Sequence, residues 1–366
     1  MKISTLLQQN RLLVVLGHGG VGKTTVSATL GIQAASLGLK TAVITIDPAN
    51  RLADVFDNDA PMTTLTPIEI SDIQGSLHAM MLDRKYTCDE LVKRFSTDHA
   101  THEKTLSNPY YKHFSTSLAG GQEYMAIETV YRQLESEDFD LIILDTPPSA
   151  HAFDFLDAPK RLINGIKRLP TIDQSKPGGF ARRLREKGGA IVLDGLRRFT
   201  GGRFLTDLTN FLGLFKHVLF GLARASEQLE GILRSETTAF IYVELKSSGA
   251  TDRIKNCRQA LMHRNLTLNG VVFNRTPMTI DEAILAKSRN RIVNALHAAR
   301  SLKIDDDLIT AVSQTYNLLH ERQYTNQTEN EFVVNNVNAW TIPLKRGWVS
   351  TPQTLKSLGD EITPIL

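Results

Sequence analysis

Short apolar runs alternate along the chain with longer stretches in which apolar residues recur every three or four positions. Residues 12–16 read Leu-Leu-Val-Val-Leu, whereas the apolar residues between Val26 and Ala35 follow a helical period. Continuous apolar runs of this length are typical of strands buried on both faces. The pattern predicts strands at residues 11–16, 39–46, 77–82, 139–144, 239–245, 268–273 and 339–343. It predicts helices at residues 23–37, 88–96, 121–135, 251–264, 280–300 and 306–321.

The regular alternation of strands and helices indicates an α/β fold, with a doubly wound, mostly parallel sheet that helices cover on both faces. A chain of 366 residues has room for one such domain with an insertion. We expect residues 1–157 and 236–366 to form the two parts of this core. Residues 158–235 interrupt the alternation, and we expect them to form a largely helical insert.

The expected insert has a basic first part and an apolar second part. Between Lys160 and Arg203 there are twelve Lys or Arg residues against three acidic ones, although the whole chain carries a net charge of only +3. Residues 202–233 read as an apolar helix, which either packs as ordinary core or forms a hydrophobic client groove or a membrane-surface contact. The basic run is either a solvated face or a site for an acidic partner or anionic lipid headgroups.

The composition narrows the class of protein. With 42% hydrophobic and 22% charged residues, the chain is typical of a soluble globular protein. Cys88 and Cys257 lie far apart in the sequence, which argues against a disulfide scaffold or a cysteine zinc site and favours a reducing compartment. We expect neither a leader peptide nor a membrane-spanning helix, and therefore a cytoplasmic protein, free or peripheral at the membrane. Nucleic acid is not an expected partner, because the basic run lacks interleaved aromatic residues.

Residues 17–25, Gly-His-Gly-Gly-Val-Gly-Lys-Thr-Thr, carry the clearest chemical signal. Gly17, Gly22, Lys23 and Thr24 fit the phosphate-binding pattern G-x-x-x-x-G-K-[ST]. The segment lies between an expected buried strand and an expected helix, where backbone amides and the positive end of the helix dipole bind phosphate. Lys23 adds a positive charge near the β- and γ-phosphates, and the Thr24 hydroxyl is placed to bind Mg²⁺. The sequence therefore predicts a P-loop nucleoside triphosphatase core.

Two acidic residues follow expected strands and complete the candidate site. Asp47 comes after the strand at 39–46, and Asp145 comes after the strand at 139–144. Ligands of open α/β sheets lie beyond the carboxyl ends of the strands, so both carboxylates are expected to reach the phosphates bound by the first loop. The alternative for each is a structural aspartate that caps a helix or a turn.

The loop and the two acidic segments together resemble the arsenite-pump and tail-anchored-protein-targeting ATPase family, whose members are nucleotide-gated dimers of the deviant P-loop class. Residues 47–56 match its first switch, D-P-A-H-x-L-x-D-x-F, except that Asn50 replaces the histidine, and residues 145–151 are close to its second switch, D-T-A-P-T-G-H. Residues 271–275 resemble the family's adenine-contacting V-V-N segment, and residues 340–344 resemble its late x-x-P-L strand end. The resemblance covers nearly the whole chain except about residues 158–235, and it is closest to a bacterial branch of uncertain client.

This resemblance implies ATP and Mg²⁺ as cofactors and assigns residues to them. Thr24 would bind Mg²⁺ directly, and Asp47 and Asp145 would hold it through water. The phosphates would be held by the Lys23 side chain and by the backbone amides of Gly19, Gly20, Val21, Gly22, Lys23, Thr24 and Thr25.

Three further positions match residues of the family's site. Asp54 corresponds to the water-polarising acid, so it would act as a general base or orient the water that attacks the γ-phosphate. Asn274 would hydrogen-bond the adenine base, with Pro343 close to it.

His18 departs from the family, because it stands where the family has its signature lysine. That lysine reaches across the dimer to the phosphates of the partner's nucleotide, and losing such a cation can cost several orders of magnitude in rate. Histidine is shorter and about neutral at pH 7. Either hydrolysis is slow, or His18 becomes protonated against phosphate, or a paralogous subunit supplies the lysine in a heterodimer. The remaining reading is a neutral replacement, with another basic residue substituting.

The resemblance implies an ATP-driven dimeric switch that binds or delivers a hydrophobic or membrane-associated client. The dimer would be a homodimer or a heterodimer with a paralogous ATPase subunit. One alternative is a nucleotide-binding scaffold with little hydrolysis, and a weaker one is a partition or division-site type of ATPase. Cys88 and Cys257 form neither a cysteine cluster nor a C-x-x-C motif, so we expect no metalloid site and no zinc-clamped dimer.

Overall fold

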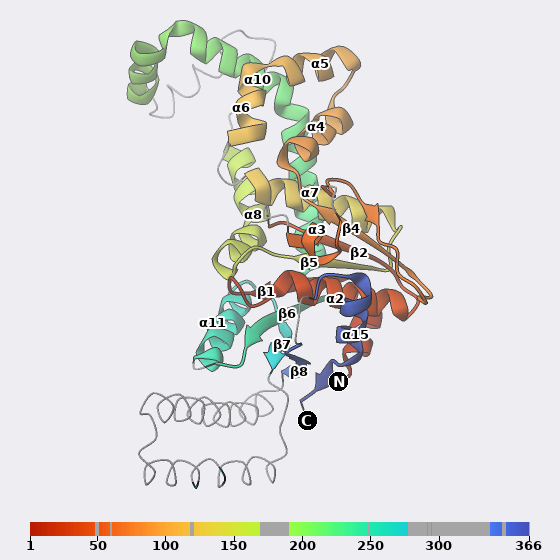
Figure 1. Ribbon diagram of the computed structural model, residues 1–366. Helices are drawn as coiled ribbons and strands as arrows, with labels where there is room; N and C mark the ends of the chain where they lie inside the picture. Colours follow the sequence, from red (N-terminus) through yellow and green to blue (C-terminus); the bar gives the residue numbers. More distant parts are fainter. Residues whose placement is uncertain are drawn as a thin grey trace, which may run out of the picture.

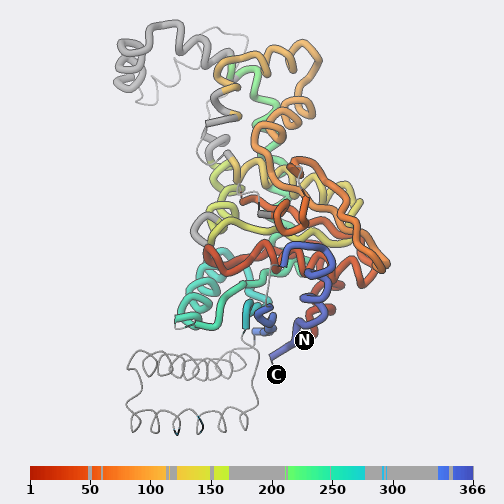
Figure 2. The backbone as a smooth tube through the Cα atoms, in the orientation of Figure 1, coloured from red at the N-terminus to blue at the C-terminus, as the bar shows by residue number. Residues whose placement is uncertain are grey.

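The computed structural model describes residues 1–47, 51–58, 61–117, 121–168, 190–247, 249–276, 291, 294, 337–345 and 349–365. For residues 190–210 it describes the backbone alone. Figure 1 shows a sheet with helices on both faces and a group of helices that extends away from one face. The path of the chain can be followed in Figure 2, where the two termini lie on the same side of the molecule. The indole Nε1 of Trp340 donates a hydrogen bond to the Met1 carbonyl at 3.1 Å, so the ends of the chain are tied together.

Among the described residues, nine strands form one sheet in the order β3-β4-β2-β5-β1-β6-β7-β8-β9. All seven predicted strands are present, and they pair in parallel with one another. They are β1 (Leu12–Gly17), β2 (Lys40–Thr45), β4 (Ser76–Met81), β5 (Leu141–Asp145), β6 (Thr238–Leu245), β7 (Leu268–Thr276) and β8 (Asn338–Pro343). Two further strands of the described chain were not predicted, the two-residue edge strands β3 (Thr66–Pro67) and β9 (Thr363–Pro364), which pair antiparallel with their neighbours.

Alternate residues of the central strands pack into two separate cores. Leu13 and Val15 of β1 face the side covered by α1 (Ile3–Gln9), α2 (Lys23–Ser36) and α15 (Pro352–Asp360). Leu12 and Val14 face the opposite side, where α7 (Gly121–Ser136), α8 (Ser149–Arg168) and α11 (Ala250–Met262) pack on the sheet. Burial on both faces explains why these strands read as continuous apolar runs. The α/β prediction of a doubly wound, mostly parallel sheet is confirmed.

A helical layer extends from the second face of the sheet. The long helix α10 (Ala190–Leu233) packs against α7 and α8, and against α4 (Arg84–Phe95), α5 (His99–Ser107) and α6 (Pro109–Ser117) (Figure 1). The buried rings of Phe211 and Phe215 stack with their centroids 5.2 Å apart, and Tyr110 and Tyr111 of α6 lie against them. The layer therefore includes helices from outside residues 158–235, and α8 runs without a break through the expected boundary at 157 and 158.

The second half of α10, which belongs to the apolar stretch at 202–233, packs mainly inside the molecule. Its buried residues are Phe211, Phe215, Val218, Leu222, Ala225, Leu229 and Leu233. Phe220, in contrast, is 54% exposed. In the parts of the chain that the structure describes, no helix is both long enough and apolar enough to span a membrane. The basic positions between 169 and 189 lie outside the described residues.

The helices at 23–37, 88–96, 121–135 and 251–264 are confirmed as α2, α4, α7 and α11. α4 begins earlier than predicted because the Asp83 side chain accepts a hydrogen bond from the Tyr86 amide at 2.6 Å and caps the first turn. The helices predicted at 280–300 and 306–321 lie outside the described residues, apart from positions 291 and 294.

Candidate nucleotide-binding site

The segment between β1 and α2 forms a tight loop at the carboxyl edge of the sheet. Gly20 has φ 82° and Gly22 has φ 86°, which is left-handed backbone that residues other than glycine rarely adopt. A Cβ atom at Gly22 would also lie 2.4 Å from the Asn274 side-chain nitrogen, so this position has no room for a side chain. Helix α2 begins at Lys23, as predicted, and its N-terminus therefore faces the loop.

The Lys23 side chain folds back over this loop. Its ammonium group donates a hydrogen bond to the His18 carbonyl at 3.0 Å, although the residue as a whole is buried. The positive charge is thus held beside the amides of the loop and the first turn of α2. Both features attract an anion, and together they are the arrangement that binds the phosphates of a nucleotide.

Asp145 is the polar centre of the site. It ends β5, which lies between β2 and β1, and its buried carboxylate accepts hydrogen bonds from Thr24 Oγ1 at 2.7 Å and Thr45 Oγ1 at 2.9 Å. Thr45 Oγ1 in turn accepts a hydrogen bond from the Asp47 amide at 3.3 Å. Hydrogen bonds therefore join α2, β2 and β5, which are far apart in sequence, at one edge of the sheet.

Burial raises the pKa of Asp145 to about 6, because a carboxylate loses hydration inside the protein. The hydroxyl groups of Thr24 and Thr45 and the charge of Lys23 act in the opposite direction. The oxygen atoms of Thr24, Asp47 and Asp145 are the kind of ligands that Mg²⁺ prefers. The donor set therefore fits Mg²⁺, whose charge would compensate for the buried carboxylate.

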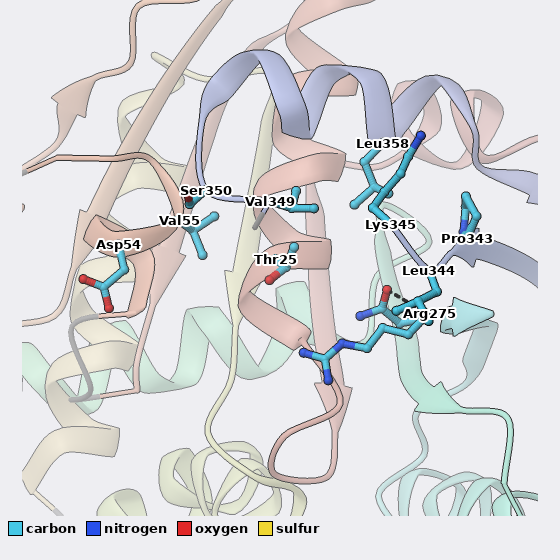
Figure 3. A pocket seen from close by; sticks show the side chains of 11 residues that line it. Thr25, Asp54, Val55, Arg275, Pro343, Leu344, Lys345, Val349, Ser350 and Leu358 are labelled. Atoms are coloured by element: carbon cyan, nitrogen blue, oxygen red, sulfur yellow. Dashed lines mark hydrogen bonds between the residues drawn. The ribbon is translucent and has the colours of Figure 1, made fainter. Parts of the chain in front are cut away.

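A pocket of about 530 Å³ lies next to the loop (Figure 3). Thr25, Asp54, Asn274 and Pro343 are among the residues that line it. Figure 3 shows Asp54 on one side and Arg275 and Pro343 on the other, with Thr25 between them. Pockets that hold cofactors are typically of this size.

Asn274 connects this pocket to the loop. Its side-chain nitrogen donates a hydrogen bond to the Val21 carbonyl at 2.9 Å, and its side-chain oxygen accepts one from the Arg275 amide at 2.9 Å. The family resemblance assigns Asn274 only to the adenine base. The structure shows that this buried amide also supports the phosphate loop. Arg275 and Lys345 line the same pocket and were not predicted, although each lies within two residues of a predicted position.

Asp54 and His18 lie on the exposed rim of the site. Asp54 belongs to the short helix α3 (Arg51–Val55), which the sequence pattern did not predict. His18 is exposed, and its ring nitrogen Nδ1 is 2.6 Å from the hydroxyl oxygen of Tyr242 on β6. Tyr242 was also not predicted, because a tyrosine within a buried strand gives no signal of its own. The described residues thus bring together the loop, Asp47, Asp54, Asp145, Asn274 and Pro343 at one edge of the sheet.

Comparison with protein families agrees with this geometry. The family model described as anion-transporting ATPase matches residues 10–283, a segment that contains the loop, both acidic strand ends and Asn274. The chain belongs to the anion-transporting ATPase family. The family resemblance proposed from the sequence is therefore confirmed, and the closer likeness to a bacterial branch stays a prediction.

Several curated members of the anion-transporting ATPase family are similar to this chain. ATPase ARSA2 of Chlamydomonas reinhardtii is 26% identical over 285 residues, which cover 76% of this chain and 72% of that protein. ATPase ASNA1 homolog 2 of Paramecium tetraurelia is 34% identical over 161 residues, covering 43% of this chain and 46% of that protein. ATPase GET3 of Podospora anserina is 28% identical over 193 residues, covering 52% and 55%. The chain thus spans about half the length of several relatives that it matches.

Proposed function

We propose that this member of the anion-transporting ATPase family binds Mg²⁺ and ATP at the loop of residues 17–25 and hydrolyses the nucleotide. The observation that carries the proposal is the joining of Thr24, Thr45 and Asp145 at the sheet edge, beside the Lys23 ammonium. This arrangement places carboxylate and hydroxyl oxygens next to a cationic, amide-lined loop. It supplies ligands for a metal and for phosphates at the same place.

The phosphates would lie against the Lys23 ammonium and the backbone amides of residues 19–25. Thr24, Asp47 and Asp145 would hold Mg²⁺, which neutralises charge on the β- and γ-phosphates when it is bound. The base would enter the pocket between Asn274 and Pro343. The short distance from Asn274 to the loop would let one residue support both ends of the nucleotide.

Asp54 is the residue we assign to the attacking water. Its carboxylate lines the same pocket as Thr25 of the first turn of α2 and is exposed, so a water molecule can reach it. It would orient this water in line with the γ-phosphorus and accept its proton, and ADP and phosphate would leave.

The pair Asp54→Asn and Lys23→Ala tests these assignments. Asp54→Asn should bind ATP with nearly unchanged affinity but lower kcat by about 100-fold, because only the step that needs the carboxylate is lost. Lys23→Ala should weaken ATP binding itself, since the charge contacts phosphate before and during the reaction. Calorimetric titration with ATP, together with phosphate release, separates the two effects. Normal turnover by Asp54→Asn would remove that residue from the mechanism.

His18 supports a second candidate function, a nucleotide-binding subunit that hydrolyses little ATP alone. Its imidazole is engaged by Tyr242 and does not provide the fixed charge of a lysine. In this reading a paralogous subunit supplies the lysine across a heterodimer. The substitution His18→Lys should then raise the rate of the isolated protein strongly. An unchanged or lower rate, with wild-type turnover in the range of an active ATPase, would exclude the scaffold reading.

We further propose that nucleotide exchange moves the helical layer and that this layer contacts a hydrophobic or membrane-associated client. The segment that begins at Asp47 leads into α3, and the segment that begins at Asp145 leads into α8. Helix α8 in turn packs against α10. A change at the γ-phosphate therefore has a path of packed helices toward α10. The exposed ring of Phe220 is the described apolar side chain of α10 that such a client could meet.

A further inference from the structure

The loop histidine is held by a residue from another strand. Tyr242 lies on β6, directly beside β1 in the sheet, and the parallel register places Tyr242 opposite Leu16 and Val243 opposite Gly17. The tyrosine is fully buried, and its hydroxyl oxygen lies 2.6 Å from His18 Nδ1. The two rings meet edge to face, with an interplanar angle of 82° and centroids 6.3 Å apart. A rigid strand thus fixes one edge of an otherwise exposed imidazole.

Hydrogen-bond accounting selects one arrangement of protons. A tyrosine hydroxyl carries a single hydrogen, and neutral histidine carries a hydrogen on only one of its ring nitrogens. Within the described part of the chain, the Tyr242 hydroxyl has no other hydrogen-bond acceptor. If Nδ1 carried the histidine hydrogen, the buried hydroxyl hydrogen would have no acceptor, which costs free energy. If Tyr242 donates to Nδ1, both groups are satisfied, and the histidine hydrogen lies on Nε2.

Two further features keep this arrangement in place. Burial raises the pKa of Tyr242, so its hydroxyl keeps the hydrogen that it donates. The His18 carbonyl accepts the hydrogen bond from Lys23, which holds the backbone of the same residue. Because the two ring nitrogens point in diverging directions, contact at Nδ1 turns Nε2 away from Tyr242, on a residue that is itself exposed.

We propose that Tyr242 is a positioning residue that holds His18 with Nε2–H exposed, as a hydrogen-bond donor to nucleotide phosphate. The identity of the acceptor rests on the proposed function, whereas the pairing and the position of the hydrogen do not. The histidine then supplies an oriented donor at the position where the family has a lysine. If His18 gains a second proton beside phosphate, Nδ1–H donates to the tyrosine oxygen and Nε2–H is unchanged, so both charge states present the same donor.

The test uses the full-length protein labelled with ¹⁵N-histidine. The His18 signals are assigned by their loss in His18→Gln. With the imidazole neutral, the wild type should show Nδ1 without hydrogen and Nε2 with hydrogen. Tyr242→Phe keeps the ring that packs in the strand but removes the hydroxyl, and its His18 signals should move toward an average of both tautomers. Tyr111→Phe is the matched control, because Tyr111 is equally buried and donates to Asp89 in the helical layer. It should leave the His18 signals unchanged.

Kinetics test the phosphate contact separately. Tyr242→Phe should lower kcat about two- to tenfold, the range set by one hydrogen bond. The same substitution should have no effect in a His18→Lys background, since lysine does not need the tyrosine. Identical His18 spectra in the wild type and Tyr242→Phe would overturn the pairing. If Tyr242→Phe shifts the His18 spectrum but lowers kcat equally in the wild-type and His18→Lys backgrounds, the proposed contact between His18 and phosphate is overturned. Absence of ATP hydrolysis in every variant would contradict the proposed function, while the spectra would still decide the pairing.

Discussion

Backbone conformation and steric space restrict Gly20 and Gly22 of the phosphate loop in different ways. Gly20 and Gly22 both have left-handed backbone, but their surroundings differ. A Cβ atom at Gly20 would meet nothing within 4 Å, whereas one at Gly22 would meet the Asn274 amide at 2.4 Å. A substitution at either glycine would therefore strain the backbone, but of these two positions only Gly22 would also bring the new side chain into a steric clash. This difference allows the two effects to be measured separately.

Gly22→Ala should weaken ATP binding at least about tenfold, because the added methyl group separates Asn274 from the loop and displaces amides that face phosphate. Gly20→Ala should show mainly the strain of about 1–2 kcal/mol in the free energy of unfolding. Calorimetric titration and urea denaturation give both quantities for each variant. Equal losses of ATP affinity would mean that contact with Asn274 does not shape the loop.

Glu128 and Glu135 both accept hydrogen bonds from Arg94, and they should make the stability of the protein depend on pH in opposite directions. Burial raises the pKa of Glu128, so the folded protein holds this proton more tightly than the unfolded chain, and stability falls as pH rises. Hydrogen bonds from Arg94 and Tyr131 lower the pKa of Glu135, whose contribution is present at neutral pH and is lost as pH falls.

Urea denaturation between about pH 4 and about pH 7 tests this assignment. As pH rises, the free energy of unfolding of Glu128→Gln should increase relative to that of the wild type. Over the same range, the free energy of unfolding of Glu135→Gln should decrease relative to that of the wild type. The same sign in both variants would contradict the difference in burial on which the prediction depends.

Among the structural elements, α10 presents a buried face and at least one exposed aromatic residue. Leu222→Ala should lower the free energy of unfolding by about 2–5 kcal/mol, because it leaves a cavity in the core to which this buried side chain belongs. Phe220→Ser should change stability by no more than about 0.5 kcal/mol. The second variant therefore tests client binding in an intact fold. If Phe220→Ser retains every hydrophobic partner captured by the wild type, this surface is not the client site.

The elements also show which parts of the structure the sequence can predict. The central strands were predictable because both of their faces are buried, which leaves uninterrupted apolar runs. α5 was missed because its sequence, His-Ala-Thr-His-Glu-Lys-Thr-Leu-Ser, has almost no apolar period and depends on the Asp98 cap. α8 was missed because Pro159 lies inside it. In the site, the phosphate loop has a motif, but Tyr242 reaches His18 only through the pairing of β6 with β1.

For the whole molecule, the account predicts association that depends on nucleotide. The Asp54→Asn variant should retain ATP, so sedimentation velocity can compare its oligomeric state with ATP and with ADP. We expect a dimer that changes its compactness or affinity when ADP replaces ATP, because in the proposed site the γ-phosphate would contact the segments that lead into α3 and α8. A monomer in every nucleotide state would contradict a homodimer. Copurification of a lysine-bearing paralogue would then support the heterodimer.

The most direct measurement is Mg²⁺-dependent phosphate release from ATP by the isolated protein, compared with Lys23→Ala and Lys40→Ala. Lys40 is an exposed lysine at the start of β2 and serves as the matched control. We expect saturable hydrolysis that requires Mg²⁺, falls by about 100-fold or more in Lys23→Ala, and is unchanged in Lys40→Ala. Turnover that survives in Lys23→Ala, or a wild type that neither binds nor hydrolyses ATP, would contradict it.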